Sequence, residues 1–298
     1  IALIALPLQA LQNYEKRRDC NKFKDVVVFG NDFSDTGNAY KLTKNKYPPS
    51  PPYFHGRFSN GPVWPDYFVS IIKAKLHDYA FGGASCDSTL VPSFAGPNKI
   101  PVPGLVQQVD DFISKDIKKF NLKETLFVFG TILLDYDQSL GEADPAKIVA
   151  SVGKRLECLY KAGATNFMVF TSMPTGMFTP GEQANFSPEL LQKITEKTTL
   201  HNQYANDALD AFKKDHPDVN LFLIKVDEVV NVVFSPETLG KLGITVFDIG
   251  CVPDSGFAGK HSVVCDDPKK YLYFDNYTAI NTKVLEEFTK QIVTYLTV

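Results

Sequence analysis

Residues 24–38 read KDVVVFGNDFSDTGN, and this stretch decides the fold. Its first half, residues 24–30, is a short run of β-branched residues that ends at glycine, which is typical of a buried strand. Polar residues follow at once and mark the place where the chain leaves the sheet. In a doubly wound α/β fold, ligands bind outside the carboxyl ends of the strands. We therefore expect residues 31–38 to lie at a functional site.

The same alternation continues through the rest of the chain. Strands are predicted by short apolar runs over residues 24–30, 76–81, 125–130, 166–172 and 219–226. Amphipathic helices are predicted over residues 60–74, 104–120, 145–162, 188–214 and 279–296. Apolar strands that alternate with amphipathic helices indicate a parallel sheet covered on both faces. The expected fold class is therefore α/β, a three-layer α/β/α sandwich with a mainly parallel sheet of about five strands.

Composition restricts the class of protein. The chain has 298 residues, of which 44% are hydrophobic and 22% charged, and its formal net charge is −3. The hydrophobic fraction excludes intrinsic disorder, and the absence of a basic stripe argues against a nucleic-acid partner. No Pro/Gly linker separates two halves, so we expect residues 21–298 to form a single domain.

The N-terminal residues and two cysteines indicate a secreted protein. Residues 1–10, IALIALPLQA, are apolar but too short to span a bilayer, and they resemble the end of a secretory signal peptide. We assign residues 1–20 to that N-terminal segment; the alternative is an apolar arm packed on the domain. Cys251 and Cys265 flank a loop rich in Gly, Ser and Asp, which predicts a disulfide.

Cys158 and two sequons allow further predictions about thiols, metals and glycosylation. Cys158 is expected to be a buried free thiol on the apolar face of a helix. No Cys/His cluster has zinc spacing, so we expect neither a metal nor a cofactor. Sequons at Asn185 and Asn276 predict glycosylation.

Residues 29–38, FGNDFSDTGN, resemble the signature FGDSLSDTGN of the GDSL lipases and esterases, also called SGNH hydrolases. Further blocks follow in the family's order: GRFSNGPVW at 56–64, YAFGGA at 79–84 and CDDPKKYLYFD at 265–275. The resemblance spans residues 24–298 and implies an SGNH-hydrolase-like fold. It also implies the family's chemistry, in which a Ser attacks an ester, a His takes its proton, an Asp orients that His, and Gly and Asn hold the oxyanion.

Most of these catalytic groups are replaced. Alignment with the signature places Asp32 where the nucleophilic Ser belongs. The block G-x-N-D-Y aligns with residues 132–136, so Leu134 stands in place of the oxyanion Asn. The block D-x-x-H aligns with residues 275–278, so Thr278 stands in place of the base His. The groups that remain are a glycine donor, Gly82 or Gly83, and the orienting Asp275.

Three other residues, Ser34, Asp32 and His261, could in principle supply the missing nucleophile or base of ester hydrolysis. Ser34 is the nearest hydroxyl, but it matches the second Ser of the signature, and we expect it to bond to backbone at the turn. Asp32 could attack an ester as a carboxylate, but hydrolysis of the acyl-enzyme would still need a base. His261, in the loop between the two cysteines, could fold over the site as that base.

Three aspartates, Asp32, Asp135 and Asp275, are expected at strand ends or loops on one rim of the sheet. If they converge, one must be protonated, hydrogen-bonded or bound to a cation. A hard cation such as calcium would accept such oxygens. In the alternative arrangement, Asp32 accepts turn amides and Asp275 bonds to Thr278 or backbone.

We therefore expect a secreted member of this fold that has lost ester hydrolysis. It would act by binding a glycan or an acylated ligand at Asp32, Asp135 and Asp275, or as a structural or storage protein. Two alternatives remain open. The first is an active carboxylic-ester hydrolase, of lipase or acetylesterase type, with rearranged residues. The second is a cation-binding site at the aspartates.

Overall fold

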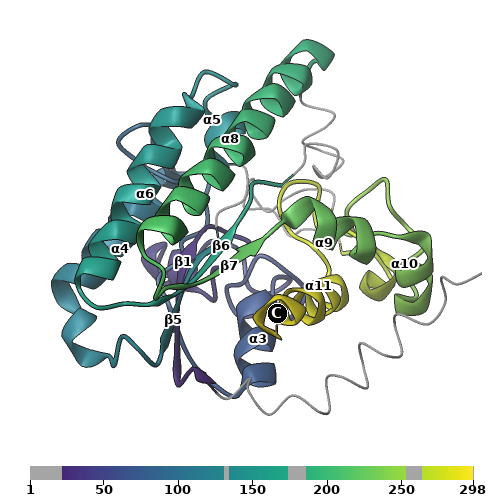
Figure 1. Cartoon of the computed structure of the whole chain (residues 1–298). Helices are drawn as coiled ribbons and strands as arrows, with labels where there is room; N and C mark the ends of the chain where they lie inside the picture. Colours follow the sequence, from purple (N-terminus) through teal and green to yellow (C-terminus); the bar gives the residue numbers. More distant parts are fainter. Residues whose placement is uncertain (1–21, 131–133, 174–185, 253–263, 298) are drawn as a thin grey trace, which may run out of the picture.

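A parallel sheet of five strands forms the centre of the protein (Figure 1). The computed structural model describes residues 22–130, 134–173, 186–252 and 264–297. The strand order is β2-β1-β5-β6-β7, and every neighbouring pair is parallel, as the apolar runs predicted. The strands are β1 (Asp25–Gly30), β2 (Lys75–Asp78), β5 (Thr125–Gly130), β6 (Asn166–Phe170) and β7 (Asn220–Ile224).

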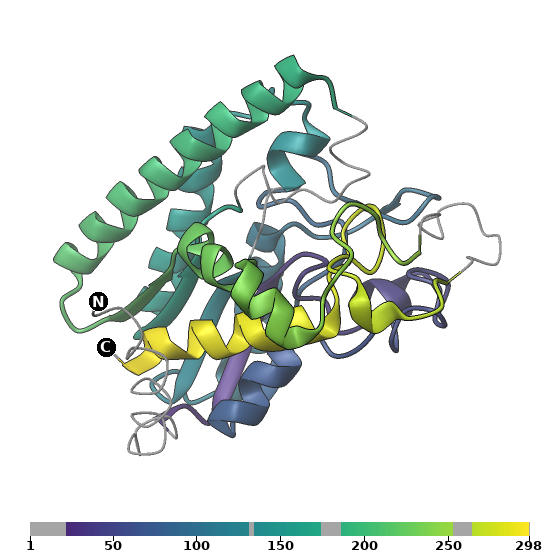
Figure 2. The ribbon, with the colours of Figure 1, turned by 90° about the vertical axis from the view of Figure 1, so that its right-hand side faces the viewer.

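Helices cover both faces of this sheet, which confirms the predicted three layers (Figures 1 and 2). One face carries α4 (Leu105–Lys115), α6 (Pro145–Lys161) and α8 (Pro188–Asp215), and the other carries α3 (Trp64–Ile72), α9 (Val226–Val233) and α11 (Thr282–Thr294). Successive side chains of a strand point to opposite faces. Val27 and Phe29 accordingly share a buried cluster with Phe112 of α4, whereas Val28 shares another with Phe68 of α3.

Several short elements complete the description. They are α2 (Asn38–Leu42), α5 (Leu134–Gln138), α10 (Pro236–Leu242), the antiparallel pair β3 (Phe94–Ala95) and β4 (Ile100–Pro101), and the 3-10 turns Ile117–Lys119, Pro268–Lys270 and Tyr295–Thr297. Helices α9 and α10 and the β3–β4 pair were not predicted from the sequence. In the part of the chain that the structure describes, no helix is long and apolar enough to cross a membrane.

The prediction of a buried thiol at Cys158 is wrong, because this residue is exposed. Its neighbours Leu156 and Leu159 are buried, as expected. Each helical residue turns the side chain by about 100°, so position 158 points roughly opposite to position 156. Among the described residues, Cys86 is a buried cysteine that forms no disulfide.

The predicted disulfide is confirmed: Cys251 and Cys265 are bonded, with their Cα atoms 5.0 Å apart. The expected N-terminal segment, residues 1–20, lies outside the described residues, as do Asn185 and His261.

The end of strand β1 is held by a buried glutamine of α4. Gln108 is 1% exposed. Its Oε1 accepts the Gly30 N–H at 2.8 Å, and its Nε2 donates to the carbonyls of Gly30 at 2.9 Å and Pro103 at 3.0 Å. A Cβ on Gly30 would lie 2.7 Å from the carbonyl oxygen of Gly130, so only glycine fits this close approach. The strand end that leads into residue 32 is therefore tied to the layer beside it.

We expect Gln108→Leu to lower the free energy of unfolding by about 1–3 kcal/mol, because it leaves the buried Gly30 N–H without this bond. The measurement is urea unfolding followed by circular dichroism. Gln192→Leu, on the exposed side of α8, is the matched control and should change stability by no more than about 0.5 kcal/mol. Equal effects of the two substitutions would contradict this role of Gln108.

Candidate functional site

The turn after β1 is organised by the buried carboxylate of Asp35. Asp35 is 0% exposed and accepts hydrogen bonds from four backbone N–H groups. Three of these, from Gly37, Asn38 and Ala39, lie at the start of α2, at 2.7, 2.6 and 3.0 Å. The fourth comes from Gly82, at 2.7 Å. Asp35 thus joins the 31–38 turn to the 79–84 block, two segments far apart in the sequence.

Ser34 has a structural role, as the sequence analysis expected. It is fully buried, its hydroxyl donates to the carbonyl of Gly130 at 3.3 Å, and it accepts the indole N–H of Trp64 at 3.1 Å. A hydroxyl without exposure and with these two bonds cannot reach an ester as a nucleophile.

Asp32, which was expected at the nucleophile position, is a buried carboxyl with one oxygen that has no partner among the described residues. It is 7% exposed, and its Oδ1 has no hydrogen-bond partner within the described residues. Burial, with a smaller contribution from the charges of Asp275 and Asp35, raises the pKa of Asp32 to about 7, and the backbone N–H groups of Asp32 and Gly83 oppose this rise. Of the two predicted glycine donors, Gly83 therefore faces Asp32, while the Gly82 N–H is used by Asp35.

Asp275, which is expected to orient a base, is occupied by its own turn. Its Oδ1 accepts the N–H groups of Tyr277, Thr278 and Ala279, each at 2.8 Å. Its Oδ2 accepts the hydroxyl of Tyr53 at 2.5 Å. The expected bond between Asp275 and the backbone of Thr278 is confirmed. Both carboxylate oxygens are thus engaged by groups of the chain, at a residue that is 3% exposed.

Two tyrosines that the sequence analysis missed lie beside these carboxylates. Tyr47 and Tyr53 bound the Pro-rich segment YPPSPPY. Burial raises the pKa of Tyr47, and the charges of Asp275 and Asp32 raise it further, which places all three groups in one neighbourhood. Burial likewise raises the pKa of Tyr53. The charge of Asp275 and the hydrogen bond between Tyr53 and Asp275 raise this pKa as well. The only sequence signal for them is their position at the ends of this segment.

Asp135 is held by a different partner. Its Oδ1 accepts the backbone N–H of Cys86 at 2.9 Å, and the residue is 3% exposed. Burial raises the pKa of Asp135, while the thiol and N–H of Cys86 lower it. Leu134 begins α5, but its side chain lies outside what the structure describes. Among the described residues, no group of three or more His, Cys, Asp and Glu side chains is placed to hold a metal ion. Within the described part of the chain, Asp32, Asp135 and Asp275 do not form such a group.

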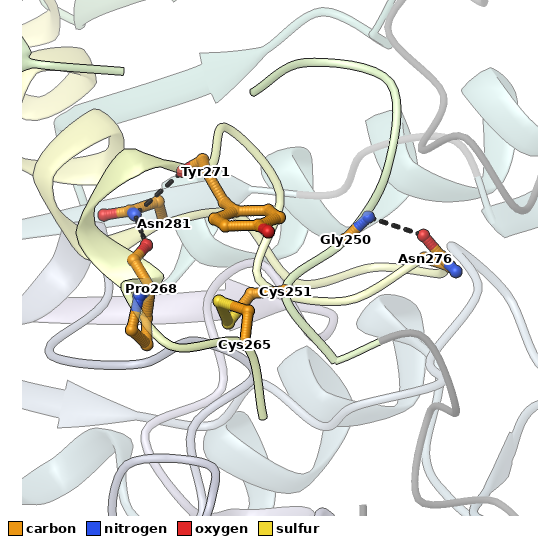
Figure 3. Close-up of a disulfide and its surroundings, with 7 residues drawn as sticks. All are labelled: Gly250, Cys251, Cys265, Pro268, Tyr271, Asn276 and Asn281. Atoms are coloured by element: carbon orange, nitrogen blue, oxygen red, sulfur yellow. Dashed lines mark hydrogen bonds between the residues drawn. A yellow bond between two sulfur atoms is a disulfide. The ribbon is translucent and has the colours of Figure 1, made fainter. Parts of the chain in front are cut away.

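The disulfide lies along the segment that carries Asp275 (Figure 3). The Cys251 N–H donates to the carbonyl of Tyr273 at 3.2 Å. A Cβ on Gly250 would lie 2.2 Å from the carbonyl carbon of Asp275, so these two stretches of backbone touch. Asn276 accepts the Gly250 N–H through its Oδ1 at 2.6 Å and is half-buried. Glycosylation at this sequon stays a prediction.

The chain is similar in sequence to several known proteins, all of them distant relatives. No family model matches the chain. It is 29% identical over 209 residues to the thermolabile hemolysin of Vibrio parahaemolyticus, covering 68% of this chain and 46% of that protein. It is 26% identical over 204 residues to the phosphatidylcholine-sterol acyltransferase of Aeromonas hydrophila, covering 68% and 57%. The chain thus spans about half the length of these bacterial relatives. An Arabidopsis thaliana protein named inactive GDSL esterase/lipase-like protein 23 is 24% identical over 298 residues, covering 84% of this chain and 74% of that protein.

The raised pKa of Asp32 predicts a pH-dependent contribution to stability. The folded state binds this proton up to about pH 7, whereas an exposed aspartate releases it near pH 3.8, so ionisation costs stability as the pH rises between these values. Asp32→Asn removes the cost. We expect the stability of Asp32→Asn relative to wild type to rise by at most about 4 kcal/mol between pH 4 and pH 8, measured by urea unfolding.

Asp207→Asn, on an exposed position of α8, serves as the control and should follow the pH profile of the wild type. A profile for Asp32→Asn that runs parallel to the wild type would show that Asp32 does not titrate in this way.

Proposed function

Because this chain is a member of the GDSL esterase/lipase family, or SGNH hydrolases, we propose that it keeps the family's fold, has lost ester hydrolysis and acts by binding a ligand. The observation that carries this proposal is the occupation of Asp275. An aspartate that orients a catalytic His must accept that His N–H and stabilise the imidazolium that forms. Here the Asp275 oxygens accept three backbone N–H groups and the Tyr53 hydroxyl instead.

The position of Asp32 supports the same conclusion. In ester hydrolysis, backbone N–H groups stabilise negative charge that develops on the substrate oxygen. The Gly83 N–H, the glycine donor left for that task, already stabilises the carboxylate of Asp32. An ionised Asp32 would also repel an oxyanion beside it. The glycine donor is thus engaged by Asp32, and the residues that align with the family's Ser, Asn and His are Asp32, Leu134 and Thr278.

The names of the relatives are compatible with a loss of ester hydrolysis in this chain. One relative carries the word inactive in its name, while others are named as a hemolysin and an acyltransferase. The alternative, an active carboxylic-ester hydrolase with rearranged residues, would need His261 as its base, and that residue lies outside the described residues.

For the ligand, we propose a glycan rather than an acylated molecule. Asp32 keeps 7% of its surface exposed, and a sugar hydroxyl that reached this carboxyl would supply the donor that its buried Oδ1 lacks among the described residues. Tyr47 adds an aromatic side chain with a polar end next to the carboxylates. An acyl chain would leave the Oδ1 without a partner, at a cost typical of an unsatisfied buried group.

The disulfide supports a secretory location. Disulfides persist in oxidising compartments and are rare in the cytosol. We therefore propose that the protein folds in the secretory pathway, as the sequence analysis expected. Mass spectrometry of the native protein for an oxidised Cys251–Cys265 pair tests this directly.

We expect the purified wild-type protein to hydrolyse a short-chain nitrophenyl ester at the background rate. Loss of one triad member or oxyanion donor typically costs about 10²–10⁴-fold in rate, and Ser, Asn and His are all replaced. Asp32→Ser alone should also be inactive, because nothing deprotonates the new hydroxyl. The triple variant Asp32→Ser, Leu134→Asn, Thr278→His should gain at most weak activity.

An acetylesterase of the same family provides the positive control for this assay. Wild-type turnover that disappears in Asp32→Ala would overturn the proposal and make Asp32 an unorthodox catalytic residue. Turnover that disappears in His261→Ala would favour the rearranged hydrolase.

The glycan proposal predicts binding that depends on Asp32. On an array of neutral oligosaccharides, we expect wild type to bind selected sugars and Asp32→Ala to weaken that binding at least about tenfold, since a charge-assisted hydrogen bond is lost. Asp207→Ala is the control and should bind as the wild type does. Binding that is unchanged in Asp32→Ala, or retention of acyl esters but no sugar, would argue against a glycan.

A further inference from the structure

A cavity lies between α6, α8 and the C-terminal ends of β5 and β6. Helices α6 and α8 run side by side over the sheet (Figure 1). The empty space between them measures about 470 Å³, including the part open to solvent, and the centre of a water-sized molecule can move through about 40 Å³ of it. Since one water needs about 10–15 Å³ on such a measure, the space exceeds a single water. Its walls include Phe129, Val152, Gly153, Ala205 and Ala208.

Small residues on both helices keep this space open. A Cβ added to Gly153, in the middle of α6, would meet nothing within 4 Å. Ala205 and Ala208 present only methyl groups from α8. Protein interiors normally pack as densely as organic crystals, with few voids larger than a water molecule. An interface between two long helices would ordinarily be filled by larger side chains.

One polar ring lines this space, that of His201. Its Nδ1 lies 2.8 Å from the Tyr136 hydroxyl, which forms no other side-chain hydrogen bond among the described residues. A buried hydroxyl needs an acceptor, so Tyr136 donates to Nδ1, and the ring proton sits on Nε2. Within the same part of the chain, the His201 ring forms no second hydrogen bond. Burial lowers the pKa of His201 to about 4, so the ring is neutral.

Two further polar atoms of α8 are buried without partners. Thr198 Oγ1 lies about one turn before His201, and Asn206 Oδ1 belongs to the residue next to Ala205. Thr198 is 4% exposed. Buried polar atoms are nearly always hydrogen-bonded, so unpaired ones require an explanation. Both residues belong to α8, but neither of them lines the cavity, whose polar wall is the ring of His201.

We propose that the α6–α8 cavity binds a small, neutral and mainly apolar molecule with one hydrogen-bond acceptor, which receives the His201 Nε2–H. None of the described residues that line it is charged, so a carboxylate or an ammonium would be buried without a partner. Ordered water needs two to four polar partners, whereas the lining offers His201 alone, because the thiol of Cys86 is already bonded to Asp135. A ketone, an ester or an alcohol of a few carbon atoms meets these conditions. None of the residues that line this cavity contacts Asp32 through a hydrogen bond given above, and Cys86 connects the cavity to Asp135.

The probe for this proposal is cyclohexanone, and methylcyclohexane is its counterpart without an acceptor. Nuclear magnetic resonance of protein with ¹⁵N-labelled histidine follows the His201 Nε2–H. We expect cyclohexanone to shift this resonance in a saturable manner, while methylcyclohexane leaves it in place. Equal shifts with both molecules, or no saturable shift with cyclohexanone, would overturn the assigned hydrogen bond.

Gly153→Leu tests whether the cavity itself is the site. The added side chain fills the open space beside Gly153, and we expect it to weaken cyclohexanone binding at least tenfold. The matched control is Gly240→Leu, since Gly240 lies in helix α10, is exposed, and also has nothing within 4 Å of an added Cβ. Gly240→Leu should bind as the wild type does. Should Gly153→Leu fail to fold, Gly153→Ala, which fits without contact, should still reduce affinity. Unchanged affinity in a folded Gly153 variant would overturn the proposal.

Discussion

The fold around the candidate site depends on a buried carboxylate that binds backbone rather than a cation. Asp35 receives four N–H groups, from three consecutive residues at the start of α2 and from Gly82. Desolvation raises its pKa, and these four hydrogen bonds oppose that rise. Two chain segments that are separated by more than forty residues are thereby held against each other, and with them Asp32 and Gly83. Hydrogen bonds to an ionised group are about twice as strong as neutral ones, which suits this task.

Asp275, near the C-terminal end of the sequence, is a second buried carboxylate that accepts several backbone N–H groups. Three consecutive N–H groups converge on its Oδ1, and Tyr53 reaches its Oδ2 from the Pro-rich segment. Both aspartates thus serve to hold loops. A carboxylate in a hydrolase could also orient a histidine, but it needs a free lone pair for that role. The alignment of Thr278 with the family's base histidine is consistent with the saturation of Asp275 by the backbone, because the turn supplies the partners that a base would have supplied.

The layered fold could be predicted from sequence because it depends on local periodicity. Apolar runs and helical spacing identified the five strands and the main covering helices, and the loop composition identified the disulfide. Features that depend on the approach of distant segments were not predictable in this way. Tyr53 meets Asp275 across 222 residues, and His201 meets Tyr136 across 65. The prediction that Cys158 is buried was wrong for a different reason. It relied on the apolar residues next to Cys158 in the sequence, but neighbouring residues of a helix point in different directions.

The indole of Trp64, which is hydrogen-bonded to Ser34, is an intrinsic fluorescent reporter inside the protein. Trp64 is the only tryptophan of the chain, and its fully buried indole donates to the hydroxyl of Ser34 while its ring centre lies 5.0 Å from that of Phe170. All ultraviolet emission excited at the red edge of protein absorption therefore comes from one place, beside the turn after β1. A change in the surroundings of that turn would alter the colour or lifetime of this emission without any label being attached.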